Sequence, residues 1–238
     1  MQTNRYLLPS LILAFVLGLP FPDTAQASPL QKWRVSCGAD PGAISKKGNT
    51  YTFKTSRNHC PGGNWQQRAE IATDHAKPTI TGAYQFSSNI SITSPSTQRF
   101  DIFQMHDGRN GCAPPLKLEV LPSGHLSFDA DYKIGTKPGN NCEKARSMLG
   151  QKSAKKIRRD GTEYKLDVII DFNGQGGFRV WAYLDGAPQI NAHYNPPQGR
   201  GYFQSEKYYF KHGSYSKKMF PYTMTSRDVR VRRVKLAQ

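Results

Sequence analysis

The sequence has little of several features that mark common protein classes. Helical periodicity is scarce, and no apolar run beyond residue 27 is long enough to cross a bilayer. Acidic residues are few, with 17 Asp and Glu against 33 Lys and Arg. The four cysteines form neither a CxxC pair nor the Cys/His spacing of a zinc site. These shortages argue against a helical bundle, a polytopic membrane protein and a zinc module.

The first 27 residues have the three-part layout of a secretory signal peptide. Arg5 precedes an apolar run over residues 7–21, and Ala25-Gln26-Ala27 offers a cleavage site. The run is about 15 residues long, whereas a membrane-spanning helix needs ~20, so an uncleaved membrane anchor is the less favoured alternative. We therefore expect residues 1–27 to be removed. Residues 28–238 should then form one domain, secreted or periplasmic, monomeric and not inserted in a membrane.

An exported chain with an even number of cysteines is expected to form disulfides. Cys37, Cys60, Cys112 and Cys142 allow three pairings. We predict Cys37–Cys60 and Cys112–Cys142, because each of these bonds closes a moderate local loop.

The formal net charge of +16 predicts a polyanionic partner. Nucleic acid, an anionic membrane surface and an acidic polysaccharide would each match this charge. Export argues against nucleic acid, and composition alone does not separate the other two.

Short alternating segments punctuated by Gly, Pro, Asn and Asp predict an all-β sandwich or barrel. A Gly-rich turn at 173–177 and a second turn at 184–187 mark hairpins. The expected strands are 50–55, 65–72, 82–92, 99–106, 116–121, 125–132, 163–171, 177–184, 206–215 and 227–236.

Two further groups of residues have alternative interpretations. Residues 135–160 contain a basic loop at 152–159 that is either a solvated surface or a grip for a polyanion. We expect Trp33, Trp65 and Trp181 to lie in the core, although Trp65 could instead form a sugar-stacking platform beside a groove.

Three of the expected strands carry polar side chains on one face. Because side chains alternate along a strand, Gln104 and His106 point away from Phe103 and Met105. By the same rule Arg68 shares a face with Glu70, and Tyr209 shares a face with Lys211, Gly213 and Tyr215. A sheet with these faces together would display a concave, cationic surface that is a site rather than a core.

These residue types suit β-elimination on a uronate sugar. The C5 proton is a weak acid while the adjacent carboxylate is charged, so Arg68 and Gln104 would neutralise that carboxylate. His106 and Tyr215 would supply the base and the acid. We expect Arg68 and Lys211 to favour the phenolate of Tyr215, and Lys211 to hold a neighbouring sugar carboxylate.

The three segments together resemble alginate lyases of polysaccharide lyase family seven, which carry R-(S/T)-E-L, Q-(I/V)-H and Y-F-K-x-G-x-Y on three strands in that order. Glucuronan lyases and the heparin lyase I group have comparable sites. The resemblance covers most of residues 60–236. This chain reads Arg68-Ala69-Glu70-Ile71, Gln104-Met105-His106 and Tyr209-Phe210-Lys211-His212-Gly213-Ser214-Tyr215.

The resemblance implies a concanavalin-like β-jelly-roll sandwich of two antiparallel sheets with a concave substrate groove. It implies that Arg68 and Gln104 neutralise the carboxylate, that His106 is a base or a charge neutraliser, and that Tyr215 is the acid or both acid and base. Lys211, Glu70, Tyr209 and Lys217 are the expected substrate-binding residues, with Glu70 more simply a support for Arg68. Departures from the family motifs at Ala72, Met105, His212 and Lys217 leave the identity of the uronate open.

The expected function is therefore a secreted, endo-acting polysaccharide lyase. Alginate is the favoured substrate, then glucuronan, then a sulfated glycosaminoglycan. No organic cofactor is required, and a structural calcium ion has no clear ligand cluster in the sequence. One alternative is a non-catalytic module that binds acidic glycans, and another is an exported protein that coats anionic cell surfaces through charge. Binding alone would not require Gln104, His106 and Tyr215 together.

Overall fold

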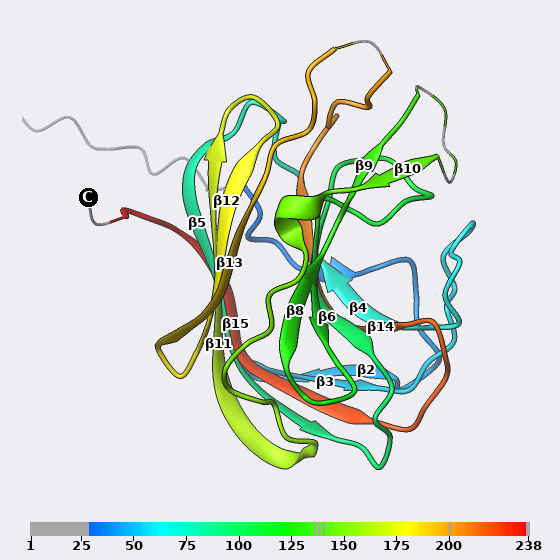
Figure 1. Ribbon diagram of the computed structural model, residues 1–238. Helices are drawn as coiled ribbons and strands as arrows, with labels where there is room; N and C mark the ends of the chain where they lie inside the picture. The colour runs from blue at the N-terminus through cyan, green and yellow to red at the C-terminus, as the bar shows by residue number, and fades with distance from the viewer. Residues whose placement is uncertain (1–28, 136, 138, 140, 200, 237–238) are drawn as a thin grey trace, which may run out of the picture.

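The structure, a computed structural model, describes residues 29–135, 137, 139, 141–199 and 201–236 (Figure 1). The predicted signal peptide lies outside these residues. Within them, no helix is long and apolar enough to cross a membrane.

Two antiparallel sheets face each other as separate layers (Figure 1), which confirms the predicted sandwich of two antiparallel sheets. The six-stranded sheet has the order β1 (Arg34–Val35), β4 (Gln67–Ala72), β14 (Tyr209–Ser216), β6 (Phe100–His106), β7 (Leu116–Val120) and β8 (Leu126–Asp129). The seven-stranded sheet has the order β13 (Ala187–Tyr194), β12 (Phe178–Leu184), β11 (Asp160–Asn173), β5 (Thr81–Thr93), β15 (Thr223–Val234), β3 (Thr50–Lys54) and β2 (Ile44–Lys47). A short ribbon of β9 (Asp131–Lys133) and β10 (Cys142–Lys144) lies beside them, with one 3₁₀ turn, η1 (Arg146–Met148).

The core fills the space between the sheets. Phe103, Met105 and Phe210 are buried there as the alternation predicted, and Phe86 of β5 meets Phe103 of β6 at 4.7 Å between ring centroids. Such aromatic contacts join the two sheets and stabilise the sandwich beyond the area that they bury.

His212, a departure from the family motif, is also fully buried in this core. Its two ring nitrogens lie 2.8 Å from the Ile102 carbonyl oxygen and 2.7 Å from the Ser226 hydroxyl. Burial lowers the pKa of His212 to about 4. His212 is therefore a neutral, fully hydrogen-bonded core residue, and it does not face the polar surface of β14.

All ten predicted strands are present, with small shifts at their ends, and the segment 125–132 is divided between β8 and β9. The sequence interpretation missed β1, β2, β10 and β13. The β13 strand lies at a sheet edge and contains Pro188, which edge strands tolerate but which weakens the strand pattern.

The two predicted disulfides, Cys37–Cys60 and Cys112–Cys142, are both formed.

The basic loop 152–159 lies alongside the edge strand β8, where the Leu126 amide donates to the Ser153 hydroxyl at 2.7 Å. None of the residues 152–159 lines the cleft described below.

The expectation that the three tryptophans are core residues is wrong for Trp65 and Trp181. All three are half-buried, but Trp33 packs against the core, where its ring meets Phe86 at 6.0 Å between ring centroids. Trp65 lies in the loop before β4, and Trp181 lies on β12 at a position that points away from the core.

Candidate active site

A cleft of about 550 Å³ runs along the outer face of the six-stranded sheet. Loop 60–65 and loop 109–114 contribute residues to its walls, and β4, β14, β6, β7 and β8 contribute to its floor. Six of the residues predicted from sequence line it: Arg68, Gln104, His106, Tyr209, Lys211 and Tyr215. The other two predicted contacts, Glu70 and Lys217, do not line the cleft.

Strand order explains why these distant residues meet. The late strand β14 lies between β4 and β6, so Tyr215 pairs with Arg68 on one side. On the other side Lys211 pairs with Gln104, and Tyr209 pairs with His106. Cross-strand partners on one face have neighbouring side chains, so the three sequence motifs form one continuous surface.

Gly213 makes the close packing of β14 against β4 possible. Its φ is +137°, and a Cβ atom at this position would clash with the Ala69 carbonyl oxygen. The register between β14 and β6 also shifts between His212 and Tyr215. A glycine is needed here because any side chain would meet the backbone of the neighbouring strand.

Glu70 organises the floor of the cleft from below. It is only 1 % exposed, and its two carboxylate oxygens accept hydrogen bonds from Arg68 at 2.7 Å and from Gln104 Nε2 at 2.6 Å. The expected direct contact between Glu70 and substrate is therefore not supported, since both oxygens are occupied and buried. Its position matches the other interpretation, a support for Arg68.

The Glu70 bond also determines how the next two groups are oriented. Because Gln104 donates through Nε2 to the carboxylate, its Oε1 faces His106, whose Nε2 lies 2.9 Å away. An amide oxygen can only accept, so neutral His106 carries its proton on Nε2 and keeps a lone pair on Nδ1.

Burial lowers the pKa of His106 well below its usual value, and the nearby cations Lys211, Lys133 and Arg68 lower it further. The ring therefore remains neutral at neutral pH. A neutral imidazole can accept a proton, but it cannot neutralise a carboxylate by charge. Of the two roles expected for His106, the structure favours proton acceptor.

Tyr215 lies at the other end of the same row. The Arg68 guanidinium carbon is 4.1 Å from its ring centroid, and Trp65 stacks on it at 4.6 Å. Burial raises the pKa of Tyr215, and this effect outweighs the opposing influence of Arg68. Arg68 thus favours the phenolate as expected, but burial dominates and the net shift favours the phenol. Tyr215 is a protonated phenol that can donate.

Five cationic side chains line the cleft against one carboxylate, that of Asp129. The cationic side chains are Arg68, Arg109, Lys117, Lys144 and Lys211. Their charge suits an anionic ligand. Burial lowers the pKa of Lys211 to about 8, although Glu70 opposes this shift.

No protein-family model and no curated protein sequence matches this chain. Its fold, however, matches solved structures. An alginate lyase of polysaccharide lyase family 7 has a TM-score of 0.54 and 14 % identity, with 87 % of this chain and 96 % of that chain covered. The chain has the fold of polysaccharide lyases.

Two further structures of this fold extend the comparison. An alginate lyase from Pseudomonas aeruginosa has a TM-score of 0.54 at 15 % identity, covering 81 % of this chain and 86 % of that one. An endo-β-1,4-glucuronan lyase from the fungus Trichoderma reesei has a TM-score of 0.52 at 12 % identity, covering 87 % and 90 %. At these identities the likeness establishes the fold, in agreement with the resemblance seen in the three motifs.

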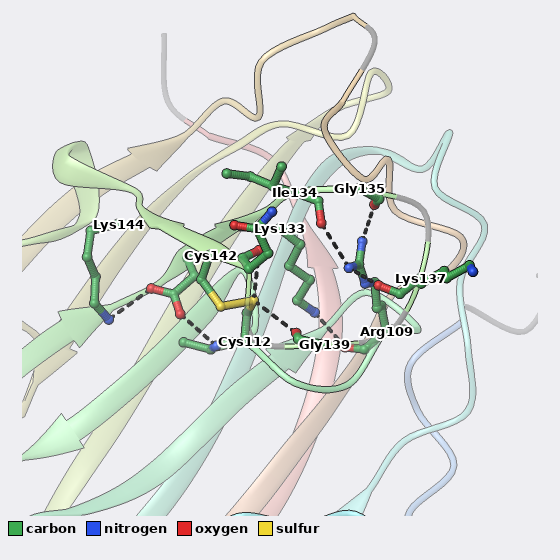
Figure 2. The surroundings of a disulfide bond; sticks show 12 residues. Arg109, Cys112, Lys133, Ile134, Gly135, Lys137, Gly139, Cys142 and Lys144 are labelled. Atoms are coloured by element: carbon green, nitrogen blue, oxygen red, sulfur yellow. Dashed lines mark hydrogen bonds and ion pairs between the residues drawn. A yellow bond between two sulfur atoms is a disulfide. The ribbon is translucent and has the colours of Figure 1, made fainter.

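One wall of the cleft in this lyase fold contains charged residues that sequence analysis did not single out. Lys133 is buried and donates to the Asp107 carboxylate and the Arg109 carbonyl oxygen. Figure 2 shows Arg109 reaching the carbonyl groups of residues 134, 135 and 137 beside the disulfide Cys112–Cys142. Asp107 directly follows His106, so this cluster holds the end of β6. The ion pair between Lys133 and Asp107 could not be predicted from the sequence, because the two residues lie on segments that are distant along the chain.

The other missed group surrounds Lys117 on β7. Its Nζ lies 2.9 Å from Glu119, 3.0 Å from Asp129 and 4.6 Å from the Trp65 ring centroid. The alternation on β7, with Leu116 and Leu118 facing inward, could have placed Lys117 and Glu119 on the outer face of the sheet, where Lys117 lines the cleft.

One cluster in the described part of the chain has the geometry of metal ligands, namely Cys112, Asp131 and Cys142. The two cysteines are joined in a disulfide, so neither offers a thiolate. This cluster therefore does not indicate a metal centre.

Proposed function

We propose that the protein is a secreted polysaccharide lyase that cleaves an acidic, uronate-containing polysaccharide by β-elimination. The main observation behind this proposal is the row of a neutral His106, a Glu70-held Gln104 and Arg68, and a protonated Tyr215 within one cationic cleft. The fold shared with alginate and glucuronan lyases supports it. The two disulfides support a location outside the cytosol.

In the proposed reaction the sugar carboxylate binds the Arg68 guanidinium and the second amide hydrogen of Gln104. Their charge and dipole stabilise the enolate-like species that forms when the C5 proton leaves. His106 accepts that proton through Nδ1. Tyr215 donates its proton to the C4 oxygen as the C4–O bond breaks and the C4=C5 double bond forms. No water is consumed in the cleavage step.

Alginate is the substrate that we place first, with glucuronan second and a sulfated glycosaminoglycan third. His106 on β6 and Tyr215 on β14 are different side chains that line the same cleft. Separate groups for the base and the acid suit a uronate whose C5 proton and C4 oxygen lie on opposite faces of the ring. Guluronate units of alginate have this arrangement, whereas glucuronate units do not.

The test is the ultraviolet absorbance of the unsaturated uronate product on a panel of alginate, glucuronan, heparin and hyaluronan. We expect absorbance to rise on at least one polymer, and His106→Ala and Tyr215→Phe each to remove most of this activity. The half-buried Tyr202, whose hydroxyl donates to Glu143 outside the cleft, provides the control variant Tyr202→Phe. No rise on any polymer would refute the lyase proposal, and full activity in both site variants would refute the assignment of residues.

A further inference from the structure

The outer face of the seven-stranded sheet, which points away from the cleft-bearing sheet (Figure 1), carries an unusual row of side chains. On β12 the inward residues Phe178, Val180, Ala182 and Leu184 are buried. The alternating positions therefore place Arg179, Trp181 and Tyr183 on the outside. A tryptophan on this face is not needed to fill the core.

The register of the sheet extends Trp181 into a row across five strands. Trp181 pairs with Asn191 on β13 and with Ile169 on β11. Ile169 pairs with Gln85 on β5, which pairs with Arg232 on β15. Four strand intervals of about 4.8 Å make this row roughly 19 Å long. We call the row from Asn191 to Arg232, together with Arg230, the outer platform.

Hydrogen bonds hold the polar end of the outer platform in place. The Nε and one terminal nitrogen of Arg232 donate to Gln85 Oε1 at 3.0 and 2.9 Å. The amide nitrogen of Gln85 in turn donates to the buried Asp167 carboxylate at 2.8 Å. Side chains ordered before binding lose less entropy when a ligand arrives.

The charges around the outer platform leave two guanidinium groups without an acidic partner. The carboxylates of this face are paired with cations: Asp171 with Arg179, Glu163 with Arg227 and Asp167 with Lys165. Arg230 and Arg232 are exposed, and neither forms an ion pair with a carboxylate among the described residues. The excess charge at this end of the row is positive.

A hollow borders the aromatic end of the row. Asp171, Arg179 and His193 line a cavity of about 450 Å³. The Arg179 guanidinium carbon lies 5.4 Å from the Trp181 ring centroid. Trp181 does not line the hollow itself, but Arg179 joins the two, so hydrogen-bonding groups lie beside the aromatic ring.

We propose that the outer platform is a second, non-catalytic binding surface for an acidic polysaccharide. The apolar face of a sugar ring stacks on Trp181, and sugar carboxylates bind Arg230 and Arg232 through paired N–H groups. The choice of ligand rests on the proposed lyase function, while the surface itself lies on the sheet opposite the cleft. A long polymer held there raises the local concentration of chain available to the cleft.

The experiment measures polymer binding separately from turnover. Affinity electrophoresis in gels containing polymeric alginate is run on the full mature protein with Tyr215→Phe as background, so that the polymer is not cleaved. Trp181→Ala and the pair Arg230→Ala/Arg232→Ala are the test variants. Arg227→Ala is the matched control, because Arg227 lies on the same strand but pairs with Glu163. Thermal melting shows that each variant is folded.

We expect each test variant to bind the polymer about tenfold more weakly, which is about 1.4 kcal/mol, and the control to change by less than about twofold. Turnover of a short oligomer with wild-type Tyr215 should be unchanged by Trp181→Ala. Equal losses in the control and the test variants would indicate simple charge attraction and overturn the proposal, as would unchanged binding in the test variants. A protein that cleaves no uronate polymer but loses binding in the test variants would support the outer platform and refute only the lyase function.

Discussion

Replacing Glu70 with Gln tests the organisation of the cleft floor with almost no change in volume. Both oxygens of Glu70 accept hydrogen bonds, one from Arg68 at 2.7 Å and one from Gln104 at 2.6 Å. A glutamine at this position has one acceptor oxygen and turns an N–H₂ group toward one of the two donors. Either Arg68 loses its partner, or the Gln104 amide must rotate and present N–H₂ to His106. In both cases the row of groups above the floor is disturbed.

The expected magnitudes follow from burial. Arg68 is 4 % exposed and Glu70 1 %, and breaking a buried ion pair by removing one partner costs about 3–5 kcal/mol. Because glutamine keeps one of the two hydrogen bonds, we expect the free energy of unfolding to fall by about 3 kcal/mol. Loss of one oriented donor to the developing negative charge should lower kcat by about a hundredfold.

Urea denaturation and initial rates of product formation provide the two measurements. Glu163→Gln is the matched control, because its ion pair with Arg227 is exposed and should contribute less than about 1 kcal/mol. A Glu70→Gln variant that unfolds more easily but keeps its kcat would limit Glu70 to a structural role. If both quantities were unchanged, the description of the cleft floor would be refuted.

Four further predictions concern pH and packing. Because burial lowers the pKa of His106, the acid limb of kcat/KM should lie below about pH 6.5, the ordinary value for histidine. Lys211 has a pKa of about 8, so it loses its charge above that pH, and KM for an anionic polymer should rise there. Lys133→Met leaves the buried Asp107 carboxylate unpaired, so urea denaturation should show a loss of about 3–5 kcal/mol. Gly213→Ala should cost at least about 2 kcal/mol, because its φ is +137° and its Cβ meets the backbone of β4.

The predictions for His106, Lys133 and Gly213 each have a control or a contradicting result. An acid limb centred at or above pH 6.5 would contradict a lowered pKa of His106. Lys144→Met removes an exposed lysine near the same wall and should cost far less than Lys133→Met. Gly186→Ala also introduces a side chain at positive φ, but with no atom within 4 Å, so equal losses at Gly186 and Gly213 would contradict the clash with β4.

Most of the correct predictions came from the alternation of side chains along strands, because this alternation depends only on local geometry. It assigned Gln104 and His106 to one face and Phe103 and Met105 to the other, as the structure has them. The same rule, applied to Phe178 and Val180 on β12, would have placed Trp181 on the outer face. The error arose from treating tryptophan as a core residue by type rather than by position.

The features that the sequence did not reveal, an ion pair and a pKa shift, depend on contacts between distant segments. Lys133 and Asp107 meet only because β9 lies against the end of β6, and nothing local signals their pairing. The pKa of Tyr215 was misjudged because neighbouring charges can be read from motifs whereas burial cannot. Trp65 buries that phenol from a loop whose path the sequence does not reveal.

If the cleft breaks a C4–O bond by elimination, as proposed, no water takes part in the cleavage. Cleavage of alginate, or of whichever panel polymer is degraded, should be carried out in water labelled with heavy oxygen and the products analysed by mass spectrometry. Elimination predicts that each cleavage yields an unsaturated uronate at one new end, and that the new reducing end takes up heavy oxygen no faster than the reducing end of an uncleaved oligomer, which exchanges slowly with water. Immediate heavy oxygen at the new reducing end, with no unsaturated sugar, would show hydrolysis and refute elimination.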